Sequence, residues 1–521
     1  MIEAGQSAVA AFLADPATYG LAGVRVERID THGAMVFLAG ERAYKIKRAV
    51  RFPYMDFSTL ELRRRACQRE IELNRRTAPE LYIGAVPITR AAGGGLALDG
   101  TGEAVEWVVV MHRFAQEALG DRLAQAGRLT AELAGALADE VAVFHDRAEP
   151  LQGAAAAGGG AAGLWAVIDE NMDELRGRPD IFAAAEVAAM ADSARAAWDQ
   201  LKDLLDARLA AGLVRRCHGD LHLRNVCVLD GRPRLFDCIE FNDAIACIDV
   251  LYDLAFLLMD LDHRDLRPLA NLVLNRYLQR REEIAGLAAL PLFLSTRATV
   301  RAKVSVSIAD TTTDPAAAQR LQDEAAGYFR AACAYLQPAD PILVAVGGLS
   351  GTGKTCLARA LAPGFGASPG AVHLRSDILR KTLHGVDALT RLPQAAYDPA
   401  QTAAVYAGLT ARAQAALTAG RAVIADAVYA TPAERDAIEA VARELSVPFI
   451  GIWLEAPAEQ IIGRVAGRQG DASDATPTVV EKQLAYDIGP LTWQKLDASP
   501  APDTVASAAR RLIAGFQAKQ A

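Results

Sequence analysis

The chain has 521 residues, enough for about two to four domains of ordinary size. Hydrophobic residues make up 52% of the sequence, which supplies sizeable cores and excludes an intrinsically disordered chain. The formal net charge of −8 argues against a protein whose main task is to coat nucleic acid, although it leaves room for a local basic groove.

The cysteines and the apolar segments bear on the compartment. The seven cysteines form no CxxC pair, and the spacings of ten, eleven and nine between the four at 217–247 fit no common zinc motif. The first ten residues lack the basic segment of a secretory signal. The most apolar run, Val250–Leu261, contains two aspartates and is too short to cross a bilayer. We therefore expect a cytoplasmic protein with reduced cysteines and no membrane partner.

The N-terminal part of the chain has the pattern of a small β-rich lobe, about residues 1–112, followed by a mostly helical region, about residues 113–337. The expected elements of the lobe are strands at Ala34–Ala39 and Ala43–Val50, a charged helix at about Leu60–Arg76, and strands near Val86–Thr89 and Glu106–Met111. In the helical region, the glycine- and alanine-rich segment Gly153–Gly163 is expected to be a flexible loop or hinge.

The segment Gln337–Pro341 is the best linker candidate, because two prolines end the helical pattern there and a strand pattern follows. We therefore divide the chain into a domain of residues 1–337 and a domain of residues 341–521. In the second domain short apolar strands alternate with helices, which is typical of an α/β fold with a doubly wound parallel sheet. Its expected strands are Ile342–Val346, Val372–Leu374, Ala422–Ala425 and Phe449–Leu454.

The segment Gly348–Thr355 fits the P-loop pattern GxxxxGK[ST] and lies between a strand and a helix. Its glycines would let backbone N–H groups curl around phosphate oxygens, at a helix N-terminus that adds partial positive charge. Lys354 would reach the β and γ phosphates, and the hydroxyl of Thr355 would ligate Mg²⁺. The expected nucleotide contacts are Gly348, Ser350, Gly351, Thr352, Gly353, Lys354 and Thr355.

Further polar residues follow the other strands of this domain. Asp426 ends the third expected strand, where it would hold Mg²⁺, or else act as a cap or turn residue. Asp377 ends the second, where it could deprotonate a substrate hydroxyl or else cap the next helix, and Arg380 could clamp substrate or phosphate. Arg464 and Arg468, four apart on an expected helix, could close on the phosphates or form a solvated face.

The order of P-loop, strand-end Asp-x-x-Arg, strand-end Asp and lid arginines resembles the small P-loop kinases. Gluconate kinases, zeta-toxin kinases, chloramphenicol phosphotransferase and polynucleotide kinases share this order. The resemblance covers Pro341 to about Asp497. It implies a phosphotransferase rather than a motor or helicase ATPase, and it identifies neither the acceptor nor the choice between ATP and GTP.

A second set of polar residues lies in the N-terminal domain. The segment His218-Gly219-Asp220-Leu221-His222-Leu223-Arg224-Asn225 is followed, twelve residues after Asn225, by Asp237. A hairpin around the Asp230-Gly231 turn would bring Asn225 and Asp237 together as Mg²⁺ ligands, with Asp220 as the acid that orients the acceptor hydroxyl. The alternative is an ordinary hairpin with polar residues at its open end.

The HxDxxxxN pattern with a downstream aspartate resembles the aminoglycoside phosphotransferase family, which is related to protein kinases. The resemblance implies an α+β kinase-like fold, an ATP site, and a strand lysine that pairs with a helix glutamate. For the lysine we favour Lys45 over Lys47, and for the glutamate Glu70 over Glu72.

The resemblance to this family has further consequences and one departure. Asp249 and Asp253 resemble the acidic segment of the family and are expected to brace the catalytic loop. The glycine-rich loop of kinases is missing, since only Thr31–Ala34 precedes the first strand pair. Five acids could suit a cationic sugar or could form a solvated surface. These are Glu240, Asp243, Asp260, Asp262 and Asp265.

The combination of domains resembles a group of bacterial fusion proteins in which an aminoglycoside-phosphotransferase-like domain precedes a P-loop kinase domain. We expect a bifunctional phosphotransferase that depends on ATP and Mg²⁺, each domain acting on a hydroxyl of a sugar-like or antibiotic-like small molecule. One alternative is a P-loop kinase regulated by a degenerate, non-catalytic kinase-like domain. A third hypothesis is a polynucleotide-end kinase, which the acidic charge balance disfavours, so we expect no nucleic-acid partner. The oligomeric state is not encoded in these patterns.

Overall fold

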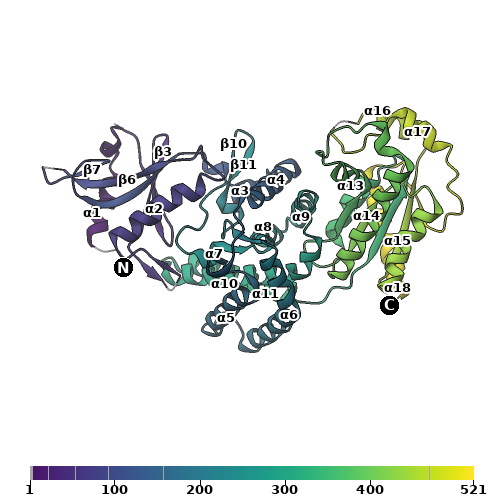
Figure 1. The fold of residues 1–521 in the computed structure, drawn as a ribbon. Coiled ribbons are helices and arrows are strands. Elements are labelled where there is room, and N and C mark those ends of the chain that lie inside the picture. The colour runs from purple at the N-terminus through teal and green to yellow at the C-terminus, as the bar shows by residue number, and fades with distance from the viewer. Residues whose placement is uncertain are drawn as a thin grey trace. The chain divides into compact units, whose positions relative to one another are not determined.

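The computed structural model describes residues 4–21, 23–52, 54–91, 93–156, 158–468 and 470–520. Two compact units can be distinguished, one of Met1–Asp260 with Phe293–Cys333 and one of Leu261–Leu292 with Ala334–Ala521. The second unit therefore contains a helical segment that the sequence analysis placed in the first domain. Figure 1 shows both units as a ribbon coloured along the chain, with many of the helices and strands labelled.

The first unit begins with a six-stranded antiparallel sheet of order β1-β2-β3-β8-β6-β7. Its strands are β1 (Glu27–Asp30), β2 (Ala34–Ala39), β3 (Arg42–Lys47), β6 (Tyr82–Arg90), β7 (Leu96–Leu98) and β8 (Ala104–His112). Successive side chains alternate between two cores, since Tyr44 and Val108 face the core that includes helix α1 (Ala4–Ala14), whereas Ala43 and Val109 face helix α2 (Leu60–Asn74). A small hairpin of β4 (Arg51–Phe52) and β5 (Met55–Asp56) lies between β3 and α2. The expected β-rich lobe is confirmed.

The rest of the first unit is mostly helical. Its longer helices are α4 (Ala131–Arg147), α5 (Gly160–Arg176), α6 (Ala184–Ala210), α8 (Val250–His263), α10 (Leu290–Thr311) and α11 (Pro315–Tyr335), and its shorter ones are α3 (Gly120–Gln125) and α7 (Asp243–Ala246). Strand β9 (Val214–Arg216) pairs with β12 (Cys247–Asp249), and β10 (Val226–Leu229) forms a hairpin with β11 (Arg232–Leu235). Among the helices that the structure describes, none is both long and apolar enough to cross a bilayer.

The glycine-rich stretch before α5 is not a free loop as the sequence suggested. A Cβ on Gly158 would lie 2.0 Å from the carbonyl oxygen of Ala244, and one on Gly159 would lie 2.4 Å from Val214. The glycines therefore let the start of α5 approach neighbouring backbone closely, and the expectation of a flexible segment is wrong for these residues.

The second unit is an α/β domain with a parallel sheet of order β14-β15-β13-β16-β17. Its strands are β13 (Leu343–Gly348), β14 (Val372–Arg375), β15 (Val423–Asp426), β16 (Phe449–Glu455) and β17 (Gln494–Asp497). Its helices are α9 (Arg267–Arg280), α12 (Lys354–Leu361), α13 (Ser376–Leu383), α14 (Pro399–Thr418), α15 (Pro432–Glu444), α16 (Ala458–Ala466), α17 (Pro477–Leu484) and α18 (Pro502–Gln520). The four strands expected from the sequence and the doubly wound fold are confirmed, and β17 is an additional strand.

The edge strand β14 is held by α9. The side-chain amides of Asn271 and Asn275 donate to the carbonyl oxygen of Ala371, at 3.0 and 3.1 Å, and the backbone N–H of His373 donates to Asn275 Oδ1 at 2.7 Å. Side-chain amides thus replace the neighbouring strand that an edge otherwise lacks. This explains why the segment that contains α9 belongs to the second unit.

Candidate active sites

The P-loop joins the end of β13 to the start of α12. Gly348, Gly351 and Gly353 have φ angles of 136°, 89° and 95°, in the left-handed region that favours glycine. A Cβ on Gly351 would also lie 2.7 Å from the side chain of Ile461. The loop therefore has the curled backbone that the motif predicts, and Lys354 and Thr355 are the first two residues of the helix that follows it.

The two expected Mg²⁺ ligands of the P-loop lie in direct contact. The hydroxyl of Thr355 donates to Asp426 Oδ2 at 2.6 Å, and His373 Nε2 lies 3.4 Å from the same oxygen. Burial opposes ionisation of Asp426, yet the hydrogen bond from His373 and the charges of Arg375 and Lys354 lower the pKa of this carboxyl to about 2. Asp426 is therefore a carboxylate at neutral pH, which is the form that a metal ion requires.

Asp377 belongs to the same group of charges. It is the second residue of α13, whose N-cap position is held by Arg375, so it is not the N-cap of that helix. Burial raises the pKa of the Asp377 carboxyl, and the positive charges of Arg375 and Lys354 oppose that rise. Lys354 donates to the carbonyl oxygen of Leu349 at 3.0 Å, and burial lowers its pKa.

The expected arginines differ in outcome. Helix α16 ends at Ala466, with Gly467 as its C-cap, so Arg468 lies beyond it and the expectation of a shared helical face is wrong. Arg464 donates to the carbonyl oxygen of Ala498 at 2.9 Å, whereas the charge of Arg468 acts on Lys354. Arg380 is buried and donates to the carbonyl oxygen of Ala396 at 2.7 Å. Of the three, Arg468 is the one whose charge acts on Lys354 of the P-loop.

Three residues of this site were missed by the sequence reasoning. His373 and Arg375 lie two residues apart on β14, which pairs with the strand that ends at Asp426. Gln483 of α17 accepts a hydrogen bond from the backbone N–H of Ser350 at 2.8 Å. The period-2 pattern of β14 could have indicated the first two, because side chains two apart on a strand share a face. No local signal could have indicated Gln483, which lies 133 residues from its partner.

In the N-terminal unit, the hairpin brings Asn225 and Asp237 to one end. Asp230 and Gly231 have φ angles of 48° and 73°, as a tight hairpin turn requires, and the N–H of Phe236 donates to the carbonyl oxygen of Asn225 at 3.0 Å. Asn225 Nδ2 donates to the carboxylate of Asp220 at 2.8 Å. This orientation uses the amide nitrogen of Asn225, and the amide oxygen is the atom that a metal ion would take.

The strand lysine, the helix glutamate and the downstream aspartate also meet. Lys45 Nζ donates to Glu70 Oε1 at 2.9 Å and forms an ion pair with Asp237. Burial disfavours the charged lysine, but Asp237 and Glu70 hold the pKa of Lys45 well above its usual value. Asp237 has a φ angle of 60°, which is rare for a residue with a side chain and often marks a functional site.

A second lysine contacts the same glutamate. Lys47 Nζ lies 2.5 Å from Glu70 Oε2 and 2.5 Å from Glu240 Oε1, and all three side chains are buried. Glu72, the other candidate partner, is exposed. The contacts with Asp237 distinguish Lys45 from Lys47, which the sequence pattern alone could not do. Glu240 was not anticipated as a partner of either lysine.

Asp220 lies in an electropositive setting. His222 Nε2 lies 3.3 Å from Asp220 Oδ2, and Arg301 of α10 adds a buried positive charge. Although burial opposes it, these charges hold the pKa of Asp220 below its usual value, so the group is a carboxylate at neutral pH. Nothing in the sequence near Asp220 pointed to Arg301, because α10 is distant along the chain.

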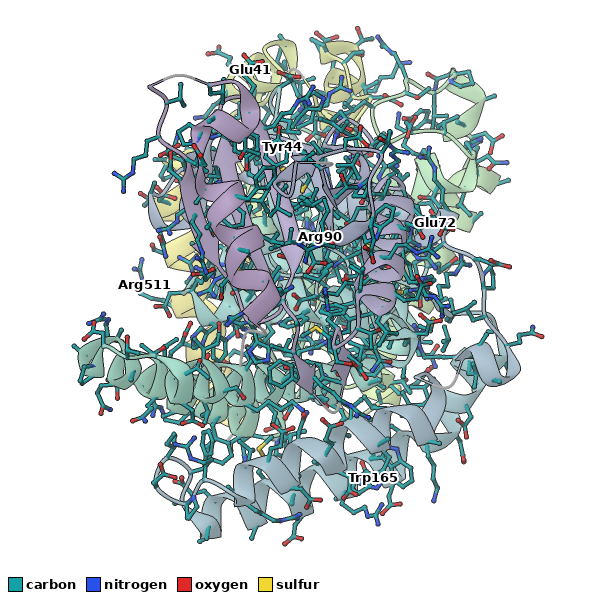
Figure 2. All side chains as sticks on the ribbon, turned by 90° about the vertical axis from the view of Figure 1, so that its left-hand side faces the viewer. Glu41, Tyr44, Glu72, Arg90, Trp165 and Arg511 are labelled. Atoms are coloured by element: carbon teal, nitrogen blue, oxygen red, sulfur yellow. The ribbon has the colours of Figure 1, made fainter. Side chains whose placement is uncertain are left out.

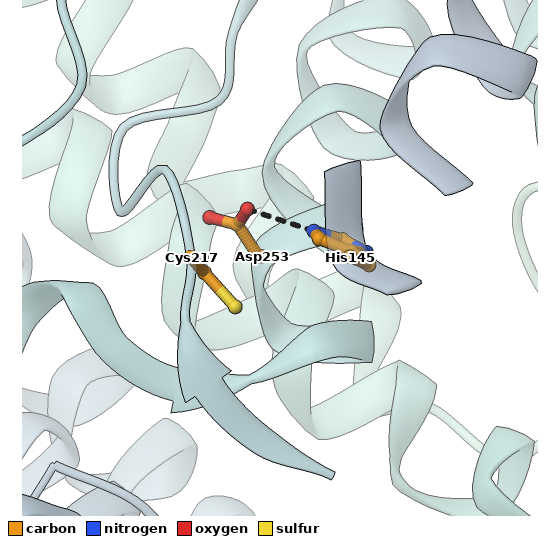
Figure 3. Close-up of side chains that lie close together, drawn as sticks. All are labelled: His145, Cys217 and Asp253. Atoms are coloured by element: carbon orange, nitrogen blue, oxygen red, sulfur yellow. Dashed lines mark hydrogen bonds and ion pairs between the residues drawn. The ribbon is translucent and has the colours of Figure 1, made fainter. Parts of the chain in front are cut away.

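The loop that leads to Asp220 is held in place by Asp253. Its carboxylate accepts hydrogen bonds from the backbone N–H groups of His218 and Gly219, at 3.1 and 2.8 Å, and lies 3.0 Å from His145 Nε2 (Figure 3). Cys217, the third member of this cluster, donates its thiol to the carbonyl oxygen of Ile248, and burial holds the pKa of that thiol well above its usual value. The cluster thus has the hydrogen bonds of a structural brace, while a metal ion would need a thiolate.

Comparison with known proteins places these two sites in families. Residues 51–290 match the model of a phosphotransferase enzyme family, and residues 343–487 match the model of an AAA domain. The uncharacterized protein Rv2004c of Mycobacterium tuberculosis is 31% identical to this chain over 471 residues, which cover 88% of this chain and 90% of that protein. The chain belongs to the family of this mycobacterial protein. The fusion of a phosphotransferase-family domain with a P-loop kinase-like domain is confirmed, and the protein is an ATP-dependent phosphotransferase.

Two solved structures are similar to parts of the chain. A choline/ethanolamine kinase family protein from Mesorhizobium loti has 16% identity and a TM-score of 0.35, over 64% of this chain and 98% of that chain. A gluconokinase from Sinorhizobium meliloti 1021 has 18% identity and a TM-score of 0.26, over 35% of this chain and 98% of that chain. At these values neither similarity bears on the acceptor of this protein.

Where kinases have a glycine-rich loop, the phosphotransferase-family domain has a short turn between β1 and β2. The carbonyl oxygen of Gly33 accepts the backbone N–H of Arg48 at 2.8 Å, and His32 Nε2 lies 2.8 Å from the hydroxyl of Tyr54 in the β4–β5 hairpin. A Cβ on Gly33 would meet the side chain of Met55 at 3.0 Å. The turn is therefore fastened to its neighbours, whereas a glycine-rich loop is open.

Of the five acids that could suit a cationic sugar, four are engaged within the protein. Glu240 is paired with Lys47, and Asp243 lies 2.8 Å from Arg216. Asp260 accepts the backbone N–H of Leu223 at 2.9 Å, and Asp262 accepts the hydroxyl of Tyr335 at 2.9 Å. Asp265 is exposed. These contacts favour structural roles for the acids over a shared acceptor surface.

Proposed function

We propose that the protein is a bifunctional phosphotransferase, in which each domain transfers the γ-phosphoryl group of ATP to a hydroxyl group of a small molecule. The observation that carries the proposal is that each unit holds a full set of polar groups for this chemistry. Phosphoryl transfer needs oxygen ligands for Mg²⁺, a cation on the phosphates and a carboxylate for the acceptor hydroxyl.

In the phosphotransferase-family domain, Asn225 and Asp237 would hold Mg²⁺, and Lys45, fixed by Glu70, would contact the phosphates. Mg²⁺ held there would supply positive charge that offsets the charge of the phosphates. Asp220 would accept the proton of the acceptor hydroxyl, since His222 and Arg301 keep it ionised. The ion pair of Lys45 with Asp237 supports this assignment, because it brings the phosphate-binding cation next to the metal ligand.

In the P-loop domain, Thr355 and Asp426 would hold Mg²⁺, and the loop from Gly348 would surround the phosphates. Asp377 would take the proton of the acceptor, and Arg468 would offset charge that develops during transfer. The contact between Thr355 and Asp426 supports this assignment, because it brings the two oxygen atoms that would hold the metal ion next to each other. Arg464 is left out of the proposed machinery, because it is engaged with Ala498.

A second candidate function is that the N-terminal domain only binds a ligand and regulates the P-loop domain. The observation that favours it is the fastened turn at His32 and Gly33, which lacks the open glycine-rich backbone that covers phosphates in kinases. The meeting of Asp220, Asn225 and Asp237 favours catalysis instead. One experiment separates the two functions.

The test is transfer of labelled phosphate from ATP to a metabolite extract by the full chain, with Asp220→Asn and Lys354→Ala as variants. Two active sites predict that each variant loses a different labelled product or accumulates an intermediate. The regulatory alternative predicts that Asp220→Asn keeps every product that wild type makes. Arg90→Ala serves as the control, because Arg90 is an exposed residue of β6.

A further inference from the structure

A crevice of about 690 Å³ opens on the N-terminal unit, and none of the residues assigned to catalysis lines it. Its walls are the C-terminal part of α2, the end of α4, and strands β9 and β11. Glu72 of α2, labelled in Figure 2, lies on its rim and is exposed. The volume is in the range of ordinary small-molecule sites.

The lining of this crevice is rich in arginine. It includes Arg76, Arg147, Arg216, Arg232 and Arg234, together with the glutamates Glu72, Glu80, Glu140 and Glu149. Arg234 forms ion pairs with two of the glutamates, Glu80 and Glu140. The five arginines and four glutamates of the lining together carry a formal charge of +1.

Two of these arginines lie at the surface of the crevice with their charge left unpaired by the residues that the structure describes. Arg147 and Arg232 are exposed, and neither makes an ion pair within the part of the chain that the structure describes. Arg76 lies 5.0 Å above the ring of Phe144 and donates to the carbonyl oxygen of Arg216 at 2.9 Å. Its positive charge is therefore held in place by neutral partners.

Arg216 supplies the observation that points to a ligand. Its Nη1 atom donates to Asp243 Oδ1 at 2.8 Å, but Nε and Nη2 are buried and have no hydrogen-bond partner among the described residues. A buried N–H group without a partner is costly, and guanidinium groups bind phosphate oxygens with paired hydrogen bonds. A second hollow of about 440 Å³, lined also by Arg65 and Arg69, adjoins the crevice at Arg216.

We propose that this crevice binds the phosphate group of a phosphorylated small molecule, at a site separate from both nucleotide sites. Arg76, Arg147, Arg216 and Arg232 would contact the phosphate, whose oxygens accept hydrogen bonds from guanidinium N–H groups. The binding itself does not depend on the proposed function of the domain.

The position of the crevice suggests what occupancy would do, and this part rests on the proposed function. Helix α2 carries Glu70, β9 leads to Asp220, and β11 leads to Asp237. A ligand held between these elements would restrain all three catalytic side chains at once. Occupancy should therefore raise the turnover of the phosphotransferase-family domain.

The test is calorimetric titration of the full chain with glycerol 3-phosphate and, separately, with inorganic phosphate. Mg²⁺ and a non-hydrolysable ATP analogue are present at saturation, so that both nucleotide sites are filled. The variant Arg147→Ala/Arg232→Ala should weaken binding by about tenfold or more. The matched control Arg25→Ala/Arg90→Ala, also two exposed arginines of this unit, should leave it unchanged.

The arms of the titration also identify the source of the phosphate group. If glycerol 3-phosphate binds more tightly than inorganic phosphate, the ligand is a phosphorylated metabolite. If both probes bind equally, the ligand is free phosphate. In either case binding must be lost in the double variant. No binding to wild type, or equal affinity in wild type and the double variant, would overturn the proposal. Chloride that competes as well as the probes would mark an adventitious ion only and would overturn it too. If the probes bind to wild type and binding is lost in the double variant, but occupancy does not raise turnover, the result would count against the proposed function and not against this site.

Discussion

Glu70 is the residue on which the N-terminal site depends most. It is fully buried, and each of its two carboxylate oxygens forms an ion pair with a lysine of β3, one with Lys45 and the other with Lys47. Alternation along β3 puts both lysines on the face that Glu70 approaches from α2. Glu240 completes the group, and its burial raises the pKa of its own carboxyl. The positive charge of Lys47 thus offsets the repulsion between the carboxylates of Glu70 and Glu240. Lys45 instead contacts Asp237.

The substitution Lys47→Met should destabilise the unit strongly, because Glu70 and Glu240 then face each other without their shared cation. Loss of one partner from a buried ion pair costs about 3–5 kcal/mol. Urea unfolding of the full chain measures the loss. The double variant Lys47→Met/Glu240→Gln should lose clearly less, since the second carboxylate is gone. Equal losses in the single and double variants would contradict this account of Lys47.

The pH dependence of the P-loop domain should follow Asp377. This carboxyl must be ionised to accept a proton, and burial raises its pKa, so kcat/KM should begin to fall at a higher pH than for an ordinary aspartate. Arg375→Gln removes a positive charge that opposes the rise, and should move this acid limb to still higher pH. The profiles are measured in an Asp220→Asn background, with the exposed Arg443→Gln as control. An acid limb that moves to lower pH in Arg375→Gln would rule out Asp377 as the group that titrates.

At the scale of elements, strands were predicted better than the contacts between them. The apolar runs of the parallel sheet are strong local signals, and Asp426 follows directly from the end of one of them. The helix end at Gly467 was missed, because a spacing of four residues indicates a shared face only if the helix continues. The partnership of α9 with β14 was missed for a different reason. It depends on side-chain amides about 100 residues away from the strand, and no local pattern encodes that distance.

This partnership can be tested with Asn275→Ala. The backbone N–H of His373 would lose its acceptor, and a buried donor without a partner costs about 1–3 kcal/mol. Hydrogen exchange at the His373 amide should therefore become faster in the full chain. Asn271→Ala is the matched control, because Asn275 still serves Ala371 and the His373 amide keeps its bond. Unchanged exchange in Asn275→Ala would mean that α9 does not hold this edge.

For the whole molecule, the sequence predicted two kinase-like domains, which the comparisons confirm, and a candidate site in each of them. The motifs of these candidate sites can be recognised because a P-loop and a hairpin are built from neighbours along the chain. The supporting residues Glu240, Arg301, His373 and Gln483 come from distant segments, so only the folded chain brings them into place. The same limit applies to the segment that holds α9, which the sequence placed in one domain and the structure groups with the other.

If each domain binds ATP as proposed, ligand binding should have two separate effects. A ligand at about 100 times its Kd stabilises the unit that binds it by about 2.7 kcal/mol. With Mg²⁺ and a non-hydrolysable ATP analogue, hydrogen exchange should slow both in β13 beside the P-loop and in β3 around Lys45. Lys354→Ala should abolish the protection of β13 alone, and Lys45→Met that of β3 alone. Removal of Mg²⁺ with a chelator should weaken both effects, because the negative charges of Asp426 and Asp237 then repel the phosphates. Protection of β13 only, in wild type, would favour the P-loop kinase with a regulatory N-terminal domain over the bifunctional enzyme.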